Sequence, residues 1–249
     1  MSALLEVRGL TRRFGGLTAV KNVSFAIAGG ELTGVLGPNG AGKTTLFNLL
    51  TGFVAPDAGE VRFAGADITG LARHRIVSCG MARTFQQPRP FRLMTVEENV
   101  AVACLSPRGR QQPGRSLRDR VERVLRLVGL EGKGRTPVES LPYGALRRLE
   151  LARALATGPR LLLLDEPFAG LGTSEIEPLA ALIAELHRRD GLTVLMIEHK
   201  LREFMRLVRR VIAMDFGEII ADGSPSEIVV NPCVVTAYLG GAEASIGTA

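Results

Sequence analysis

The stretch Gly37-Pro38-Asn39-Gly40-Ala41-Gly42-Lys43-Thr44 determines how the rest of this chain is interpreted. It fits the pattern G-x-x-x-x-G-K-[ST] at every fixed position, and its glycines let successive backbone N–H groups converge on a phosphate. Residues 31–36 can form a short strand and residues 44–50 an apolar helix, which is the setting that the motif requires. A chance glycine-rich turn is the alternative. We expect Lys43 to reach nucleotide phosphates and the Thr44 hydroxyl to ligate Mg²⁺.

Length and composition are those of a globular protein. The 249 residues can bury a substantial core as one large domain or two small ones. No apolar run approaches a membrane span, and charges at Glu6 and Arg8 argue against a secretion signal, so we expect the chain to stay in the cytoplasm. The cysteines Cys79, Cys104 and Cys233 are scattered, which argues against a disulfide framework or a zinc site.

The formal net charge of +6 is due largely to arginine, and the densest arginine cluster lies between residues 108 and 126. Nucleic-acid grooves usually interleave aromatic platforms with basic residues, and this cluster contains none. We therefore favour a charged helix face plus loop over a nucleic-acid groove. Residues 106–114 are rich in proline, glycine, glutamine and arginine, and we expect them to form an exposed linker.

Short strands are expected on both sides of the glycine-rich motif. Residues 5–8 and 23–27 alternate apolar and polar side chains, and residues 60–63 follow a turn, which predicts an antiparallel region. Phe14 lies in this region beside two arginines, where an aromatic ring can stack on an adenine. On the residues alone, a small core aromatic is the favoured interpretation of Phe14.

Helical patterns dominate the middle of the chain. Thr95 can cap one helix and Ser116 another, and a further helix is expected over residues 145–156. We therefore expect residues from about 66 to 140 to form a largely helical insertion between two parts of a nucleotide-binding core. Gln86 lies within this segment, where prolines end the regular structure and leave an amide side chain at a strand exit; by itself it is a loop glutamine.

Two apolar runs end in residues that carry chemistry. Residues 161–164 are typical of a parallel strand buried on both faces, which delivers Asp165 and Glu166 to the edge where ligands bind in open α/β sheets. We expect Asp165 to hold Mg²⁺ and Glu166 to polarise an attacking water. A second buried strand over 193–197 delivers His199 to the same edge, where we expect it to contact a γ-phosphate. Between these strands, Ser174 is expected to cap a helix.

These motifs, in this order, resemble those of the ATP-binding subunits of ABC transporters, and the resemblance covers about residues 4–239. It extends to the glutamine loop at Gln86, the family signature at 141–145, the loop at 169–172 and the switch histidine His199. The phrases at 81–86, 143–150, 197–199 and 214–217 look most like the branched-chain amino-acid import subgroup, although related exporters share much of them.

The resemblance implies an α/β fold with a P-loop NTPase core, a mainly parallel sheet, an N-terminal antiparallel β region and a helical subdomain insertion. The core would comprise about residues 1–85 and 157–239, the signature subdomain about 86–156, and a flexible tail 240–249. Catalytic roles are implied for Glu166, His199 and Gln86. Nucleotide-binding roles are implied for Phe14, Gly37, Pro38, Asn39, Gly40, Ala41, Gly42, Lys43, Thr44, Thr45, Asp165, Tyr143 and Gly144, and Mg²⁺-binding roles for Thr44, Gln86 and Asp165.

The resemblance also implies a function and partners. ATP hydrolysis would power import of branched-chain or other hydrophobic amino acids through separate integral-membrane permease subunits, with the chain peripheral on the inner face of the cell membrane. Two cassettes, as a homodimer or a paralogous heterodimer, would close head to tail around ATP, and an extracytoplasmic substrate-binding protein would belong to the system. The alternatives are a lipid or lipopolysaccharide exporter, a soluble ABC protein acting on nucleic acid or ribosomes, and a P-loop kinase or GTPase.

Three positions depart from the family signature. The usual signature serine is Pro142, which has neither a hydroxyl nor an N–H for a γ-phosphate. The usual glutamine is Ala145, and Gly172 stands at a usually acidic or amide position in the following loop. We therefore expect a functional but slow ATPase in isolation, which its membrane partners stimulate.

Overall fold

The computed structural model describes residues 3–243. The chain divides into two compact units, which we call the terminal unit (Met1–Arg73 with Leu195–Ala249) and the central unit (His74–Val194). The boundary at residues 194–195 falls inside a buried strand, β8 (Thr193–Ile197). The two units are described separately below.

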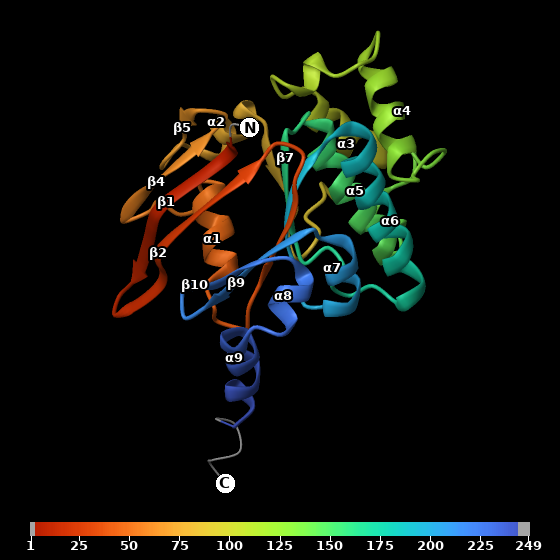
Figure 1. Cartoon of the computed structure of the whole chain (residues 1–249). Helices are drawn as coiled ribbons and strands as arrows, with labels where there is room; N and C mark the ends of the chain where they lie inside the picture. Colours follow the sequence, from red (N-terminus) through yellow and green to blue (C-terminus); the bar gives the residue numbers. More distant parts are fainter. Residues whose placement is uncertain (1–2, 244–249) are drawn as a thin grey trace. The chain divides into compact units, whose positions relative to one another are not determined.

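The terminal unit contains an antiparallel sheet. Its strands are β1 (Ala3–Phe14), β2 (Leu17–Ala28), β4 (Ala58–Phe63) and β5 (Ala66–Asp67), in the order β2-β1-β4-β5 (Figure 1). Val7 pairs with both Phe25 and Val61, and all three side chains are buried, because alternate residues of a strand point to the same face. The expected antiparallel region is confirmed.

A second group of strands in the terminal unit carries the glycine-rich motif. All residues of β3 (Leu32–Leu36) are buried, and this strand runs parallel to β9 (Arg210–Asp215), which pairs antiparallel with β10 (Glu218–Gly223). Helix α1 (Lys43–Leu50) follows β3, and α7 (Leu201–Leu207), α8 (Pro225–Val229) and α9 (Pro232–Glu243) complete the unit. Gly34 lets α7 approach β3, since a Cβ atom there would lie 2.1 Å from the Phe204 ring.

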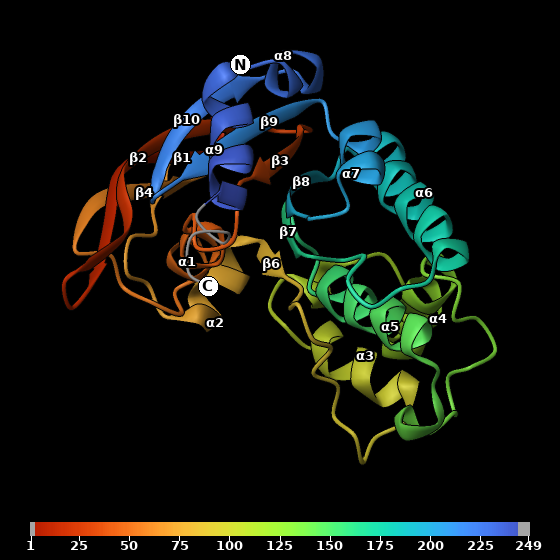
Figure 2. The same ribbon diagram turned by 90° about the horizontal axis from the view of Figure 1, so that it is seen from below.

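The central unit combines a parallel strand pair with packed helices. Strands β6 (Met81–Arg83) and β7 (Leu161–Asp165) pair in parallel, and every residue of β7 is buried. The helices are α2 (Arg73–Cys79), α3 (Val96–Cys104), η1 (Gly109–Gln111), α4 (Leu117–Leu127), η2 (Val138–Ser140), α5 (Tyr143–Ala156) and α6 (Thr173–Asp190). Helices α3, α4 and α5 pack on one another (Figure 2). The expected α/β class, with parallel strands and helices, is confirmed.

Helix starts follow local capping chemistry in most places. Thr95 and Ser116 cap α3 and α4 as expected, and each accepts a hydrogen bond from the N–H three residues later. Two expected starts are wrong. Helix α5 begins at Tyr143 rather than Ala145, because Pro142 can occupy the N-cap position without an N–H. Helix α6 begins at Thr173 rather than after Ser174.

Two expected irregular segments are more ordered than their composition indicates. Most of residues 106–114 are exposed, as expected of a linker, but the middle of the segment is ordered, because Gly109 is buried in η1 and Arg108 Nε donates to Gly158 O at 2.9 Å. Of the expected tail at 240–249, residues 240–243 belong to α9, and the remainder lies outside the described residues. Between residues 3 and 243, we find no helix with the length and apolar character needed to cross a bilayer.

Candidate nucleotide-binding site

The residues 37–44, called here the phosphate loop, connect β3 to α1 in the terminal unit. Gly42 precedes α1 with φ +98°, and a Cβ atom there would lie 2.3 Å from Ala19 O. A Cβ atom at Gly37 would lie 2.3 Å from Met214 O. Both glycines are therefore needed for close backbone approach, and Gly42 also for its left-handed conformation.

Lys43 is the buried charge of this loop. Its side chain is folded back, so that Nζ donates to Gly37 O at 2.6 Å and to Pro38 O at 2.8 Å. These carbonyls satisfy the buried ammonium. The outer residues Asn39 and Gly40 are exposed, as is Thr44, whereas Ala41 is buried and Thr45 is half-buried.

Phe14 lies at the end of β1 with 45 % of its surface exposed. The Arg12 guanidinium lies 4.8 Å from the ring centroid, which is a cation–π contact. The core aromatic that the residues alone favoured is therefore wrong. An exposed aromatic ring that already stacks with a planar cation has the properties of a platform for an adenine.

His199 follows β8 in the terminal unit and is exposed. Its neighbour Glu198 is almost fully buried, and the Glu198 carboxylate accepts the N–H groups of His199 at 2.9 Å and Lys200 at 3.2 Å. The buried carboxylate thus fixes the backbone that carries the imidazole. Sequence analysis did not assign this role to Glu198, although an acid directly after a buried strand is the available signal.

Asp165 ends β7 in the central unit, with its side chain buried. Its Oδ2 atom forms an ion pair with Arg83 of β6 at 2.5 Å, and its N–H donates to Thr84 Oγ1 at 3.4 Å. The Arg83 side chain is as buried as the carboxylate that it neutralises. Sequence analysis missed Arg83, whose signal is a charge at the end of an otherwise apolar strand.

Glu166 is held in an unusual conformation directly after β7. Its φ of +49° lies in the left-handed region, which residues other than glycine rarely adopt. Gln86 Nε2 donates to Glu166 Oε2 at 2.8 Å. The structure therefore brings together the two side chains for which sequence analysis expected roles at the attacking water and in the glutamine loop.

The residues around the start of α5 form a tight junction. Tyr143 and Gly144 lie in the first turn of α5, where a helix leaves N–H groups without intrahelical partners. A Cβ atom at Gly144 would lie 2.2 Å from Glu175 Oε1, and one at Gly170 would lie 2.7 Å from the Tyr143 ring. The Gly172 N–H donates to Glu175 Oε2 at 3.1 Å, which explains the start of α6.

A buried ion pair on α5 connects this helix to both neighbouring loops, and sequence analysis missed it. Arg147 donates to Phe85 O at 3.0 Å and to Ala169 O at 2.9 Å. Glu150 accepts the Phe85 N–H at 2.7 Å and lies 3.7 Å from Arg147. The backbone beside Gln86 and the loop after Glu166 are thus fixed to the same helix. An Arg and a Glu three residues apart on a helix also occur as surface pairs, so the sequence did not reveal their burial.

Burial raises the pKa of Glu150 from its ordinary value near 4.5 to about 7. The Phe85 N–H, Arg147 and Arg153 act in the opposite direction, since each favours the carboxylate, while Asp165 raises the pKa further. Burial outweighs the favourable partners. The charge of this carboxyl therefore changes near neutral pH.

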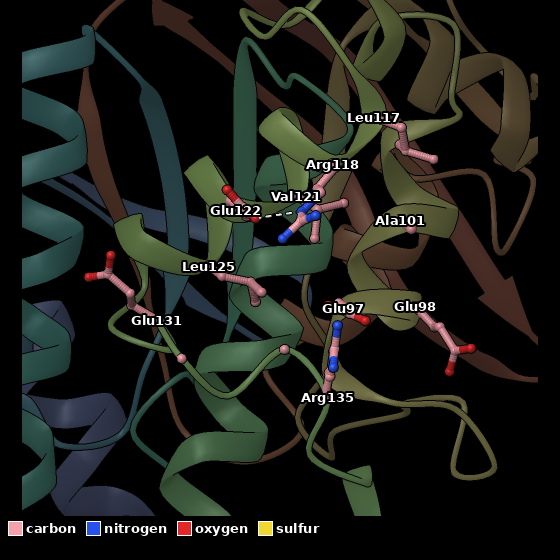
Figure 3. A pocket seen from close by; sticks show the side chains of 12 residues that line it. Glu97, Glu98, Ala101, Leu117, Arg118, Val121, Glu122, Leu125, Glu131 and Arg135 are labelled. Atoms are coloured by element: carbon pink, nitrogen blue, oxygen red, sulfur yellow. Dashed lines mark hydrogen bonds and ion pairs between the residues drawn. The ribbon is translucent and has the colours of Figure 1, made fainter.

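A groove of about 800 Å³ lies on the helical part of the central unit (Figure 3). Glu97, Glu98 and Ala101 of α3 line it together with residues of α4 and of the loop that follows α4. Its apolar part includes Leu117, Val121 and Leu125, and its charged part contains four glutamates and two arginines. The groove is therefore amphipathic, with an excess of carboxylates.

Oxygen ligands suited to Mg²⁺ are present at the expected positions. Thr44 supplies a hydroxyl, Asp165 a carboxylate and Gln86 an amide oxygen, which are the ligand types that this hard cation prefers. Among residues 3–243 there is no group of three or more His, Cys, Asp or Glu side chains arranged to hold a metal. Mg²⁺ usually completes its coordination with substrate phosphates and water, so the ligand types that each unit offers suit the ion.

Two family models match the sequence. The model described as "ABC transporter" matches residues 20–169, and the model described as "Branched-chain amino acid ATP-binding cassette transporter" matches residues 218–244. The chain is 42 % identical to the High-affinity branched-chain amino acid transport ATP-binding protein BraF of Pseudomonas aeruginosa, over 95 % of this chain and 98 % of BraF. It is 39 % identical to the Lipopolysaccharide export system ATP-binding protein LptB of Acidithiobacillus ferridurans, over 96 % of this chain and 98 % of LptB.

Solved structures match the whole fold. The crystal structure of the ADP conformation of an ATP-binding cassette from an ABC transporter superposes with a TM-score of 0.85 at 30 % identity, covering 96 % of this chain and 100 % of the other. A dimeric cassette in a post-hydrolysis state, bound to ADP and Pi, superposes with a TM-score of 0.78 at 27 % identity, covering 89 % and 98 %.

Proposed function

This chain belongs to the ABC transporter family of ATP-binding subunits, and we propose that it hydrolyses ATP to power uptake of branched-chain or other hydrophobic amino acids through separate permease subunits. The observation that carries the proposal is the phosphate loop, with Lys43 buried against its own carbonyls, in a chain that is similar to BraF over nearly its full length. The match of residues 218–244 to the branched-chain amino-acid model favours import over lipopolysaccharide export, the function for which LptB is named.

We assign nucleotide binding to residues of the terminal unit. When nucleotide binds, the Lys43 ammonium leaves the carbonyls of Gly37 and Pro38 and binds the phosphates. The N–H groups of residues 39–45, in the loop and at the start of α1, surround those phosphates. The exposed ring of Phe14 is to stack on the adenine. His199, whose backbone Glu198 fixes, is to contact the γ-phosphate as hydrolysis proceeds.

We assign the chemistry to residues of the central unit. Glu166 is to orient and polarise the attacking water, and the amide of Gln86 holds that carboxylate until substrate binds. Asp165 and Gln86 are the Mg²⁺ ligands that we assign to this unit, and Thr44 is the one that we assign to the terminal unit; the ion would neutralise charge on the phosphates when bound. For Asp165 to serve, Mg²⁺ has to share or compete for the carboxylate that Arg83 contacts through Oδ2.

We propose that a second ATP-binding subunit, identical or paralogous, completes the site. Support comes from the dimeric cassette that superposes on this chain and from the first turn of α5, whose N–H groups at Tyr143 and Gly144 can bind an anion. Pro142 and Gly172 supply fewer donors there than the family pattern does. The isolated chain is therefore expected to be a slow ATPase.

We further propose that permease subunits contact the central unit on the cytoplasmic face of the membrane. The groove between α3 and α4 supports this assignment, because its apolar floor and excess of carboxylates suit an amphipathic cytoplasmic segment with basic residues. Asn99 of α3 is fully buried and bonds both the N–H and the C=O of Phe91, so the segment after Gln86 is attached to this helix. An extracytoplasmic substrate-binding protein is expected to deliver the amino acid, and no nucleic acid is expected.

The test of the nucleotide assignment compares two lysine substitutions in the full chain. Lys43→Ala is expected to abolish binding of a fluorescent ATP analogue, because the phosphates lose their cation. Lys21→Ala is the matched control, since Lys21 lies on the surface of β2 in an ion pair with Glu218. Unaltered ATP affinity in Lys43→Ala would refute the assignment. Competition with GTP separates an ATPase from a GTPase.

The substrate is tested in the assembled transporter. Proteoliposomes are assembled with this chain, its permeases and a binding protein. They are expected to accumulate labelled leucine only when ATP is present on the side of the membrane where the cassettes lie. Outward movement of lipid instead of leucine uptake would favour the exporter alternative. Co-purification of the chain with ribosomes or DNA, without permeases, would favour the soluble alternative.

A further inference from the structure

Helix α9 is a capped and anchored helix at the C-terminal end of the described chain. Asn231 Oδ1 accepts the N–H of Cys233 at 2.9 Å and that of Val234 at 3.4 Å, and Pro232 stands at the first helical position, where no N–H is needed. The Val234 side chain is buried. The helix packs against β10 and α8 (Figures 1 and 2). Its position is therefore set by local structure.

Tyr238 lies one helical turn after Val234, and residues four apart share a helix face. Its hydroxyl oxygen accepts the N–H of Gly37 at 3.1 Å. Burial raises the pKa of Tyr238 above its usual value, so the phenol is neutral at physiological pH. A side chain from the last described helix thus contacts the first residue of the phosphate loop.

The Tyr238 contact with the phosphate loop stands beside backbone contacts that β9 and the turn after it make with the same loop. Met214 O lies where a Cβ atom of Gly37 would be, and the Gly217 N–H donates to Ala41 O at 3.1 Å. The contacts of Met214 and Gly217 come from β9 and from the turn that connects β9 to β10 of the same sheet. The Tyr238 contact comes from α9, which is not part of the sheet. Helix α9 can therefore move away from the phosphate loop without breaking a strand pair.

Tyr238 and Lys43 hold neighbouring groups of the loop. Gly37 O accepts Lys43 Nζ, while the Gly37 N–H is held by Tyr238. When Lys43 turns to the nucleotide phosphates, the carbonyls of Gly37 and Pro38 lose that donor. The Tyr238 bond does not involve Lys43, so it persists and keeps the start of the loop in place during the exchange.

We propose that Tyr238 is a positioning residue for ATP, whose hydroxyl holds Gly37 so that the phosphate loop is preformed for phosphate. Docking of α9 then sets the affinity for nucleotide. The inference rests on the proposed role of residues 37–44. A loop that spends only part of its time in the competent conformation binds with an affinity reduced by that fraction.

The test uses Tyr238→Phe in the full chain, which removes only the hydroxyl. One neutral hydrogen bond corresponds to a loss of about 2- to 10-fold in ATP affinity. The KM for ATP is expected to rise by the same factor with kcat unchanged, and the Gly37 amide is expected to exchange with deuterium faster in the nucleotide-free chain. Thr236→Val is the control, because it removes an exposed hydroxyl from the same helix.

Each outcome decides the inference. Unchanged exchange at Gly37 together with unchanged ATP affinity in Tyr238→Phe overturns it. Equal losses in Tyr238→Phe and Thr236→Val also overturn it, because the effect would then belong to α9 rather than to the hydroxyl. If Lys43→Ala retains ATP affinity, the phosphate-loop assignment itself fails. If Lys43→Ala loses affinity while Tyr238→Phe matches the unsubstituted chain, only the role of Tyr238 fails.

Discussion

Glu166 combines a strained backbone with a side chain that is already hydrogen-bonded. A positive φ at a residue other than glycine typically costs about 1–3 kcal/mol and persists only where the surroundings enforce it. Here the Gln86 amide and the end of β7 supply those surroundings. The conformation points to a residue selected for where its carboxylate lies rather than for stability.

Replacement of Glu166 by Gln tests its role as general base. Glu166→Gln keeps an oxygen acceptor for Gln86 but cannot take a proton, so ATP turnover is expected to fall by about 10²- to 10⁴-fold while ATP still binds. The closed dimer is expected to accumulate with ATP and to be visible by size-exclusion chromatography. Glu177→Gln, an exposed change on α6, is the control. Retained hydrolysis in Glu166→Gln would move the base to another residue.

The raised pKa of Glu150 has a consequence for stability. Between the ordinary value near 4.5 and the folded value of about 7, the folded chain holds a proton on Glu150 that the unfolded chain has lost. The free energy of unfolding therefore falls as pH rises through this window, and the loss is complete above about pH 7. A pKa raised from near 4.5 to about 7 corresponds to a loss of roughly 3 kcal/mol in the free energy of unfolding across this window.

Glu150→Gln isolates this contribution, because the amide oxygen can still accept the Phe85 N–H without a charge. The difference in unfolding free energy between Glu150→Gln and the unsubstituted chain is expected to be small near pH 5 and to favour Glu150→Gln near pH 8, by urea denaturation at each pH. Glu139→Gln, at an exposed glutamate, is expected to show no such trend. A difference independent of pH would contradict the raised pKa.

At the scale of elements, α5 connects the proposed anion site at its start with two neighbouring loops. Its first turn presents the N–H groups of Tyr143 and Gly144. Farther along the helix, Arg147 and Glu150 bind the backbone of Phe85, beside Gln86. Arg147 also binds Ala169 O, in the loop after Glu166. Pro142 begins the helix without a side-chain cap. A change at the start of α5 is therefore expected to act both on helix stability and on the anion site.

Pro142→Ser is expected to raise both the ATPase rate and the thermal stability of the isolated chain. Serine supplies a hydroxyl for a phosphate and a side-chain cap, which stabilises a helix by about 1 kcal/mol. The donor is expected to increase turnover about tenfold or more. Pro137→Ser, the same change at the start of η2, is the control. Equal turnover in Pro142→Ser and the unsubstituted chain would show that this departure has no functional weight.

Local signals explain which elements could be predicted. Thr95 and Ser116 cap their helices through residues three positions away, and Asp165 and Glu166 directly follow an apolar run, so short stretches of sequence contained the information. Arg147 and Phe85 lie 62 residues apart, and Tyr238 and Gly37 lie 201 residues apart. Such contacts depend on tertiary packing, for which no local pattern in this chain is diagnostic. The order of Arg108 and Gly109 was missed for the same reason.

At the scale of the whole molecule, the chain supplies only part of a transporter. The ABC transporter model matches this chain once, and a solved cassette that superposes on the chain is dimeric, in line with our proposal that the functional form contains two cassettes. We expect ATP turnover to rise when the chain is assembled with its permeases and to rise further with amino acid and binding protein. Phosphate release from proteoliposomes, with Glu166→Gln cassettes as the blank, measures this. Turnover unaffected by permeases would contradict coupling.

The ion pair between Arg83 and Asp165 bears on whether the chain needs the proposed Mg²⁺ in order to fold. A buried carboxylate without a cation is costly, and in many metal proteins the metal itself supplies the compensation, so that chelators unfold them. Here a guanidinium from the neighbouring strand supplies it. A cell can therefore make and store the empty cassette without Mg²⁺, and chelation is expected to stop ATP hydrolysis while leaving the melting temperature unchanged.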